Sequence, residues 1–302
     1  MTPDLSVVIS THSRPAMVRQ AVAAIRAQSW SGPIETIVVY DQSEPDTSLE
    51  STDALRPVRV VRNHRRAGLP GSRNAGAEVA SAPVLGFCDD DDLWLPEKAA
   101  RQLELLERTG AEASTTGIEI LVGELVVERR GESEELTFER LLQRRMIEAN
   151  MVTAVVGASA FWDLIGPLDE ALPGGYAEDY EWVLRAARRQ PLAVAPEPLV
   201  QVRWSAASHF RDRWLTIDRA LGYLVSKFPE FGDDARGWAR VQGQRAFARA
   251  AAGRRRSALH AAASSLRRRP VEPRAWLALA VASGAVPSER VVDELRRRGR
   301  GL

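Results

Sequence analysis

Short apolar runs alternate with longer amphipathic segments over the first two thirds of the chain. The runs are rich in β-branched residues and are bounded by polar or glycine-containing segments, as buried strands are. They predict strands over residues 5–10, 34–40, 58–62, 82–88 and 196–203. Helical spacing of apolar residues predicts helices over 16–28, up to Ala80 after the segment 68–76, and over 96–109. This alternation indicates an α/β fold with a mostly parallel, doubly wound sheet.

The composition changes near Phe210. Residues 210–302 are dominated by Ala, Leu and Arg, and we expect several short amphipathic helices without a fixed repeat period. The sequence therefore predicts two domains, residues 1–209 and 210–302. The first holds 21 Lys and Arg against 31 Asp and Glu, a net charge of −10, and the second 20 against 9, a net charge of +11. Such a basic region suggests contact with an anionic surface, but solvated arginines on Ala-rich helices give the same pattern.

The composition also indicates the cellular compartment in which the protein is expected. The chain has 302 residues, enough for a sizeable core, and one cysteine, Cys88, inside a predicted strand. No intrachain disulfide can form, which favours a reducing cytoplasm. Residues 1–5 lack the basic and apolar regions of a signal peptide, and no run approaches 18 apolar residues. We therefore expect a cytoplasmic protein that does not span the membrane.

Four consecutive carboxylates, Asp89–Asp92, directly follow the predicted strand 82–88, and the next base is Lys98. Open α/β sheets bind ligands at the carboxyl ends of their strands. Adjacent carboxylates repel one another, so a divalent cation with a phosphate-bearing ligand is the natural occupant. A solvated acidic loop is the alternative. A calcium loop of the EF-hand type is excluded, because Trp94 and Ala100 stand where it needs Gly and Glu.

The segment after the first predicted strand, residues 11–15, reads T-H-S-R-P and contains no glycine. A dinucleotide-binding fold needs G-x-G-x-x-G at this point. The chain also has no Walker-type phosphate loop. The predicted sheet is therefore expected to bind its ligand by another arrangement.

Four segments, in order and spacing, resemble the motifs of family 2 glycosyltransferases. S-V-V-I-S-T-H-S-R-P resembles V-V-I-P-T-Y-N-R-P, V-Y-D-Q-S resembles V-D-D-G-S, G-L-P-G-S-R-N-A-G resembles G-L-S-x-A-R-N-x-G, and F-C-D-D-D-D-L-W-L-P resembles F-L-D-A-D-D-x-x-x-P. They occupy residues 6–15, 39–43, 68–76 and 87–96. Two later segments, 165–170 and 174–185, resemble the family's G-x-F-D-E and E-D-x-x-x-x-x-R. The resemblance implies the Rossmann-like GT-A fold, with residues 210–302 as a helical appendage.

The resemblance implies a metal-assisted donor site. Asp91 aligns with the metal-binding Asp of the family's D-x-D motif, and Asp89 is the second acid, in contact with metal or ribose. Mn²⁺ or Mg²⁺ needs only one or two carboxylates when it also bridges substrate phosphates. Asp90 is assigned to the nucleotide sugar. The alternatives for Asp90 and Asp92 are support of the metal ligands from behind or a place at the start of the next helix. The family often has R-x-H after its last strand, but Ser205 stands at the His position, so His209 is a further candidate ligand.

For the nucleotide, the resemblance implies that Asp41 accepts a hydrogen bond from the base and that Thr11 lies beside the nucleoside. Tyr40 replaces the usual acid before Asp41, which weakens the preference for uridine. Arg73 is a candidate donor-binding residue, and pairing with a nearby acid explains it equally well.

For catalysis, the resemblance implies that Asp179 is the general base, on the face of the sugar opposite the leaving group. One in-line displacement with inversion then follows. Acidic neighbours such as Glu178 and Glu181 favour proton uptake there. A helix N-terminal acid stabilised by the dipole is the structural alternative. Glu178 and Trp182 are assigned to the acceptor side, and packing in the core is the favoured alternative for Trp182.

The function predicted on this basis is an inverting, metal-dependent glycosyltransferase. Its donor would be a nucleotide-diphospho-sugar, with a UDP-sugar preferred, and its acceptor a glycan or lipid-linked hydroxyl of a cell-envelope polysaccharide. Peripheral contact with the inner face of an anionic membrane is one expected use of the basic region, and a homodimer is another; binding of nucleic acid is not expected. The alternatives are a sugar-1-phosphate nucleotidyltransferase, which usually carries a G-x-G-T-R-type loop that is absent here, and a catalytically inactive nucleotide- or sugar-binding module.

Overall fold

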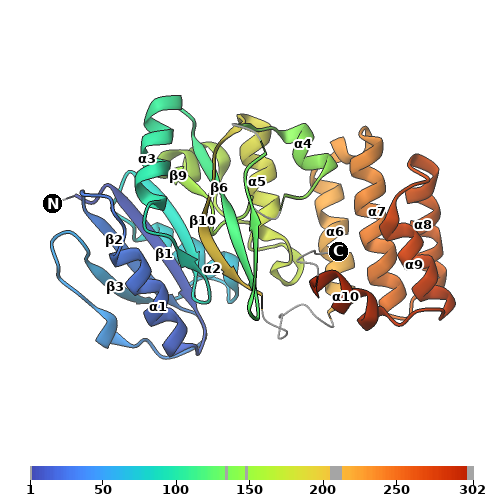
Figure 1. Ribbon diagram of the computed structural model, residues 1–302, viewed down its shortest axis with the longest axis horizontal. Helices are drawn as coiled ribbons and strands as arrows, with labels where there is room; N and C mark the ends of the chain where they lie inside the picture. The colour runs from blue at the N-terminus through green and yellow to red at the C-terminus, as the bar shows by residue number, and fades with distance from the viewer. Residues whose placement is uncertain (1, 133–134, 147–148, 205–212, 298–302) are drawn as a thin grey trace. The chain divides into compact units, whose positions relative to one another are not determined.

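The computed structural model describes residues 2–132, 135–146, 149–204 and 213–297. They form two compact units, each of which is visible in Figure 1. The sheet unit is made of the described residues of 1–138, 146–170 and 178–204, and the helical unit of those of 139–145, 171–177 and 205–302. His209 and the expected domain boundary at 209/210 lie outside the described residues.

One mixed sheet organises the sheet unit. Its described strands are β1 (Leu5–Thr11), β2 (Ile34–Tyr40), β3 (Val58–Arg62), β4 (Val84–Asp89), β5 (Leu93–Trp94), β6 (Ala113–Val122), β7 (Leu125–Arg129), β8 (Glu135–Leu136), β9 (Val155–Gly157) and β10 (Leu192–Arg203). The strand order is β3-β2-β1-β4-β9-β6-β10-β5, with β7 paired to β6 and β8 to β10. β3, β2, β1 and β4 are parallel neighbours, as are β6 and β10, while β9 runs antiparallel between β4 and β6.

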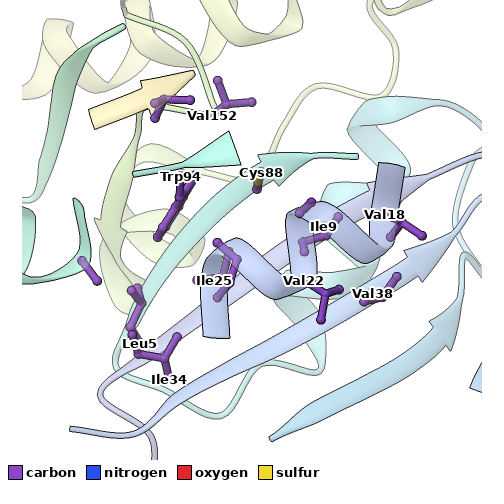
Figure 2. Close-up of a cluster of buried hydrophobic side chains, with 14 of the residues drawn as sticks. Leu5, Ile9, Val18, Val22, Ile25, Ile34, Val38, Cys88, Trp94 and Val152 are labelled. Atoms are coloured by element: carbon purple, nitrogen blue, oxygen red, sulfur yellow. The ribbon is translucent and has the colours of Figure 1, made fainter. Parts of the chain in front are cut away.

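The helices of the sheet unit are α1 (Pro15–Arg26), α2 (Leu69–Glu78), α3 (Lys98–Thr109) and α5 (Glu178–Arg189), with the short η1 (Thr47–Leu49) and η2 (Ala160–Ile165). Side chains on successive strand residues point to opposite faces. Ile9 and Val38 lie on one face and pack in a core cluster with Val22 of α1 (Figure 2). Val8 lies on the other face, where α2 approaches so closely that a Cβ on Gly76 would come within 2.3 Å of its side chain. Helices on both faces of a largely parallel sheet confirm the predicted α/β class.

Most predicted elements are present with small shifts of their ends. The strands predicted at 34–40 and 58–62 have the expected bounds, and β10 extends the one predicted at 196–203. The helix expected after the segment 68–76 already begins at Leu69. Gly68 has φ +115°, a conformation that favours glycine, and Pro70 suits the first turn of a helix. The motif is therefore mostly helix instead of loop.

The helical unit consists of α6 (Trp214–Lys227), α7 (Ala235–Ala251), α8 (Arg255–Arg268), α9 (Pro273–Ser283) and α10 (Ser288–Arg297), with η3 (Pro173–Gly175), η4 (Pro229–Gly232) and most of α4 (Phe138–Gln143). Its core joins Phe247 of α7 to small residues of α8 and α9, and Trp214 packs edge-on against Phe247. Short helices are therefore confirmed here. None of the described helices is both long and apolar enough to cross a bilayer.

Candidate active site

The carboxyl ends of β1, β2 and β4 meet at one edge of the sheet. Thr11 lies opposite Tyr40 in the register of β1 and β2, and Ser10 lies opposite Asp89 in that of β1 and β4. The acidic run begins with the last residue of β4 and continues into the turn before β5. It therefore lies at the edge where open α/β sheets bind ligands.

Three carboxylates of this run form a cluster. One carboxyl oxygen from each of Asp89, Asp91 and Asp92 lies within 4.8 Å of the others. Asp92 is buried, and its Oδ1 accepts a hydrogen bond from the Arg203 backbone N–H at 3.2 Å. Sequence reasoning placed Asp92 outside the ligand set, because adjacency in the chain does not show which side chains converge.

The cluster fits a hard divalent cation. All three groups offer oxygen, the ligand that Mg²⁺ and Mn²⁺ favour. Burial, followed by repulsion from Asp89, raises the pKa of Asp91 and raises that of Asp92 well above its ordinary value. Both carboxylates are thus short of positive charge, which a bound cation would supply.

Two arginines partly balance the acidic run. Arg14 Nη1 contacts Asp90 Oδ1 at 2.9 Å and Asp91 Oδ2 at 2.7 Å. Thr11 Oγ1 donates to Asp90 Oδ2 at 2.7 Å. The structure thus brings together Thr11 and Asp90, which the sequence assigned to the donor. On the geometry alone, Asp90 orients Thr11 and Arg14.

Arg73 of α2 is the second arginine and is only 2% exposed. Its Nη2 donates to Asp89 Oδ1 at 2.6 Å and its Nη1 to Glu178 Oε1 at 2.7 Å, which links the end of β4 to the start of α5. Burial opposes its charge, but Asp89 and Glu178 outweigh burial and raise the pKa of Arg73. Its buried Nε has no hydrogen-bond partner among the described residues. Pairing with acids, the alternative weighed for Arg73, is therefore what the structure contains.

The start of α5 carries the remaining acids. Burial, with the adjacent Asp179 as the next cause, raises the pKa of Glu178 to about 7 against the opposing effect of Arg73. Asp179 is half-buried, and its Oδ1 accepts from the Tyr180 backbone N–H at 2.7 Å. Glu178 and Asp179 thus adjoin the Asp89 end of the cluster through Arg73.

Trp182 requires a correction. Its side chain is fully buried, its Nε1 donates to the Gly166 carbonyl oxygen at 3.0 Å, and its ring packs near that of Phe161. An indole enclosed in this way cannot stack on a sugar, so the acceptor-side assignment is wrong, and the core packing weighed as its alternative is what the structure contains. The helical spacing of α5 turns residue 182 toward the core.

Asp41, at the end of β2, holds the following loop. Its Oδ1 accepts from Asn63 Nδ2 at 2.8 Å, and its Oδ2 accepts from the Gly68 backbone N–H at 2.9 Å and from Gln42 Nε2 at 3.2 Å. The carboxylate therefore fixes both ends of the segment 63–68. Tyr40, which replaces the family's acid, is buried in β2.

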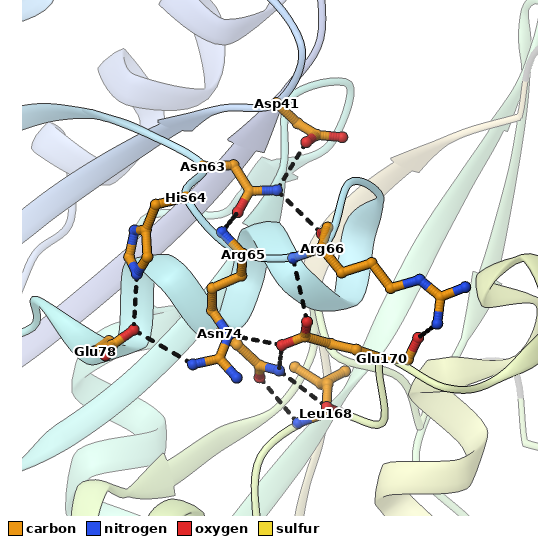
Figure 3. A network of polar contacts seen from close by, with 9 residues as sticks. All are labelled: Asp41, Asn63, His64, Arg65, Arg66, Asn74, Glu78, Leu168 and Glu170. Carbon is orange, nitrogen blue, oxygen red and sulfur yellow. Dashed lines mark hydrogen bonds and ion pairs between the residues drawn. The ribbon is translucent and has the colours of Figure 1, made fainter.

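A polar network continues from this loop to Glu170 (Figure 3). Glu170 Oε1 accepts from Arg65 Nε at 2.6 Å and from Asn74 Nδ2 at 2.9 Å, and Arg66 Nη1 donates to the Glu170 carbonyl oxygen at 2.6 Å. Asn74 also bonds both the N–H and the carbonyl oxygen of Leu168 at 2.9 Å. The network ties the loop held by Asp41 to the segment 165–170. Sequence reasoning noted both motifs but assigned Glu170 no role, because its partners lie about a hundred residues away.

Comparison with known proteins agrees with this geometry. The sequence profile of glycosyl transferase family 2 matches residues 6–162, half of the chain. An uncharacterized glycosyltransferase of Haemophilus influenzae is 29% identical over 191 residues, covering 60% of this chain and 61% of that protein. UDP-Glc:alpha-D-GlcNAc-diphosphoundecaprenol beta-1,3-glucosyltransferase WfgD of Escherichia coli is 21% identical over 142 residues, covering 46% of this chain and 55% of that protein. The chain thus spans less than two thirds of the length of these relatives.

Solved structures share the fold. TarS 1-349 of S. aureus in complex with UDP-GlcNAc superposes with a TM-score of 0.60 at 15% identity, covering 98% of this chain and 92% of that one. The mannosyltransferase PcManGT of Pyrobaculum calidifontis, in complex with GDP-Man and Mn²⁺, superposes with a TM-score of 0.53 at 16% identity, covering 97% and 79%. The predicted GT-A fold is confirmed. By its sequence profile and its fold, the chain belongs to glycosyltransferase family 2.

Proposed function

We propose that the protein transfers a sugar from a nucleotide-diphosphate donor to a hydroxyl acceptor with inversion at the anomeric carbon. The observation that carries this proposal is the chain of acids along one sheet edge. Asp89, Asp91 and Asp92 converge within 4.8 Å, and buried Arg73 joins Asp89 to Glu178, the neighbour of Asp179. One end suits a metal-bound diphosphate and the other a proton acceptor.

Asp89, Asp91 and Asp92 would hold Mn²⁺ or Mg²⁺. When bound there, the cation would neutralise the charge that develops on the diphosphate leaving group. Arg14, which contacts Asp90 and Asp91, adds a fixed positive charge at the same edge and is half-exposed. We assign Arg73 to positioning, because both of its Nη groups already hold carboxylates.

Asp41 and Thr11 are proposed to bind the nucleoside. A carboxylate offers about four acceptor sites, and Asp41 uses three of them on its own loop. One site is left for a nucleobase N–H, which suits the imide of uracil. The UDP named for WfgD and the UDP-GlcNAc bound to TarS support a UDP-sugar.

Asp179 is proposed to accept the proton of the acceptor hydroxyl as that oxygen attacks the anomeric carbon. The bond from the anomeric carbon to the diphosphate oxygen breaks on the opposite face, so one displacement inverts the configuration. Glu178 and Arg73 would fix the start of α5, and with it the side chain of Asp179.

For the acceptor we propose a glycan or a lipid-linked saccharide in the assembly of envelope polysaccharide. Two relatives are named for diphosphoundecaprenol-linked acceptors, and one for succinoglycan biosynthesis. An acceptor of this kind would bring a cytoplasmic enzyme to the inner face of the membrane. A homodimer remains a separate proposal for the helical unit.

Asp91→Asn tests the proposal. It should lower Mn²⁺-dependent binding of UDP and reduce transfer by two orders of magnitude or more, on the order of 3 kcal/mol of transition-state stabilisation. Glu107→Gln, an exposed carboxylate-to-amide change on α3, is the matched control and should transfer like the wild type. The assay supplies UDP-sugars and GDP-mannose with lipid-linked and free glycan acceptors.

Three outcomes contradict the proposal. Transfer by the wild type that survives exhaustive EDTA treatment removes the metal from the mechanism. Nucleotide binding with no transfer to any acceptor favours an inactive binding module. Release of pyrophosphate from a nucleoside triphosphate and a sugar 1-phosphate identifies a nucleotidyltransferase.

A further inference from the structure

One surface of the helical unit combines cations with exposed apolar side chains. We call it the α8 face and define it as the exposed residues Arg254, Arg255, Arg256, Leu259, Arg267, Arg268, Val271 and Trp276. Within α8, exposed positions 255, 256, 259, 263 and 267 recur at helical spacing, opposite the buried Ala258, Ala261, Ala262 and Ser265. The face therefore runs the length of the helix and continues into the turn before α9.

Among the described residues, the arginines of this face are not paired with acids, although the guanidinium of Arg268 lies 5.9 Å from the ring centroid of Trp238. In the part of the chain that the structure describes, none of its five arginines forms an ion pair. Glu272 is the one acid between residues 254 and 276, and it is buried and paired with Arg274 at 2.9 Å. The positive charge of the α8 face is thus presented to solvent.

Three of these arginines even oppose helix stability. Arg254 is the N-cap of α8 and forms no side-chain capping bond, and Arg255 and Arg256 occupy its first turn. The helix dipole favours anions at this end and disfavours cations. Neither capping nor ion pairing among the described residues accounts for their placement.

The exposed apolar side chains of the α8 face indicate which kind of anionic partner it binds. Of the nine large apolar side chains that are exposed among the described residues, three, Leu259, Val271 and Trp276, lie on this face. Val271 is 70% and Trp276 56% exposed. The indole Nε1 of Trp276 already donates to the Pro270 carbonyl oxygen at 2.8 Å, so the exposed ring has an apolar surface left to offer. Nucleic acid or an acidic protein would use the arginines but gives no reason for an exposed Val271.

We propose that the α8 face is a docking surface for an anionic lipid bilayer. The arginines would contact lipid headgroup phosphates, while Val271 and Trp276 enter the interfacial region. Tryptophan favours this depth, and arginine clusters bind anionic leaflets. At about 1.5 Å per residue, α8 would lie along about 20 Å of the surface. This proposal rests on the proposed function in one respect: a lipid-linked acceptor is the reason for the enzyme to bind a membrane.

Co-sedimentation of the full chain with vesicles tests the proposal. The protein should sediment with vesicles that contain phosphatidylglycerol, stay in solution with pure phosphatidylcholine, and dissociate as salt is added. Arg255→Gln combined with Arg267→Gln should weaken binding about thirtyfold, since each arginine near an anionic leaflet contributes about fivefold. Arg26→Gln combined with Arg108→Gln, two exposed arginines of α1 and α3, removes the same charge elsewhere and should bind like the wild type.

The apolar part of the surface needs its own variants. Trp276→Ala should weaken binding about tenfold, through loss of the apolar area that its ring would bury. Val271→Ser, in an exposed turn where folding is not at risk, should weaken it severalfold, and Leu125→Ser in β7 is the matched control. Melting temperatures of all variants show whether each remains folded.

The outcomes separate the alternatives. No sedimentation at low salt, or equal binding by the Arg255/Arg267 variant and its control, overturns the proposal. So does binding to a DNA duplex in preference to anionic vesicles. Because the assay involves no sugar transfer, failure of the proposed function leaves vesicle binding in place, and failure of vesicle binding leaves transfer to soluble acceptors intact.

Discussion

The active-site edge of the sheet unit and the α8 face of the helical unit use charge in opposite ways. Near that edge, charged side chains are buried and held: Arg73 is 2% exposed between Asp89 and Glu178, and Glu181 is fully buried with its carboxylate on Arg185 at 2.7 Å. In the helical unit, the arginines of the α8 face are exposed and form no ion pair among the described residues. Buried charge needs partners, and its geometry is then fixed. Exposed charge stabilises little and remains available.

The contrast separates two kinds of function. An active site needs carboxylates at fixed positions, and buried ion pairs hold them there. A surface that binds a lipid bilayer needs a high density of positive charge, not fixed positions for each charged group. An exposed helix face provides that density. Each mutation near the active-site edge is matched with a mutation of the same kind of group at an exposed position, so that equal effects would contradict the comparison.

The largest effect is expected for Asp179→Asn. Transfer should fall by roughly 10²–10⁴-fold, because an amide cannot accept the acceptor's proton, while donor affinity stays close to that of the wild type. Glu289→Gln, an exposed carboxylate-to-amide change in the first turn of α10, should leave turnover unchanged. The measurement is kcat together with the Kd of the nucleotide sugar.

A collapse of donor affinity along with turnover would contradict the role of Asp179 as base. It would make the residue part of the binding or folding framework instead. The helix-dipole alternative for this acid would then be the better account.

A second prediction compares two arginines. Arg73→Met leaves the half-buried Asp89 and the buried Glu178 without their shared cation and should cost about 3–5 kcal/mol of unfolding free energy. Arg255→Gln, on the α8 face, should change it by less than about 0.5 kcal/mol. Urea unfolding at constant metal concentration measures both. Similar losses of unfolding free energy for the two variants would contradict the contrast between buried, paired charges and exposed, unpaired ones.

The sequence predicted the parts of the sheet unit that depend on local patterns. β-Branched runs gave the strands, and the position of the acidic run after such a strand placed it at the ligand edge. The order and spacing of the four sequence motifs then predicted the family. These patterns are local in the sequence, so they can be interpreted without knowledge of tertiary contacts.

The contacts that complete the site could not be predicted in this way. Arg73 and Glu178 are 105 residues apart, so the sequence could suggest that Arg73 pairs with an acid but not which acid. Asp92 joins the cluster only because the turn after β4 directs it inward, and Trp182 was misassigned because its motif gives no information on burial. Long-range pairing and side-chain direction depend on the packed fold, not on spacing.

The smallest effect concerns pH. The pKa of Glu178 is raised to about 7, chiefly by burial, from an ordinary value near 4.5. Between these two pH values the folded protein binds a proton that the unfolded chain has released, so Glu178 contributes stability below about pH 4.5 that is lost as pH rises through 7. The loss is on the order of 3 kcal/mol if the whole shift is expressed.

Glu178→Gln isolates this contribution, because the amide keeps the shape of the protonated acid and does not titrate. In EDTA, the stability of the wild type relative to this variant should decrease from pH 5 to pH 8. Burial of Asp91 and Asp92 acts in the same direction in both proteins and cancels in the difference. The exposed control Glu107→Gln should parallel the wild type. A flat difference between wild type and Glu178→Gln would mean that Arg73 keeps Glu178 ionised throughout, and that the pair, not a protonated acid, holds the start of α5.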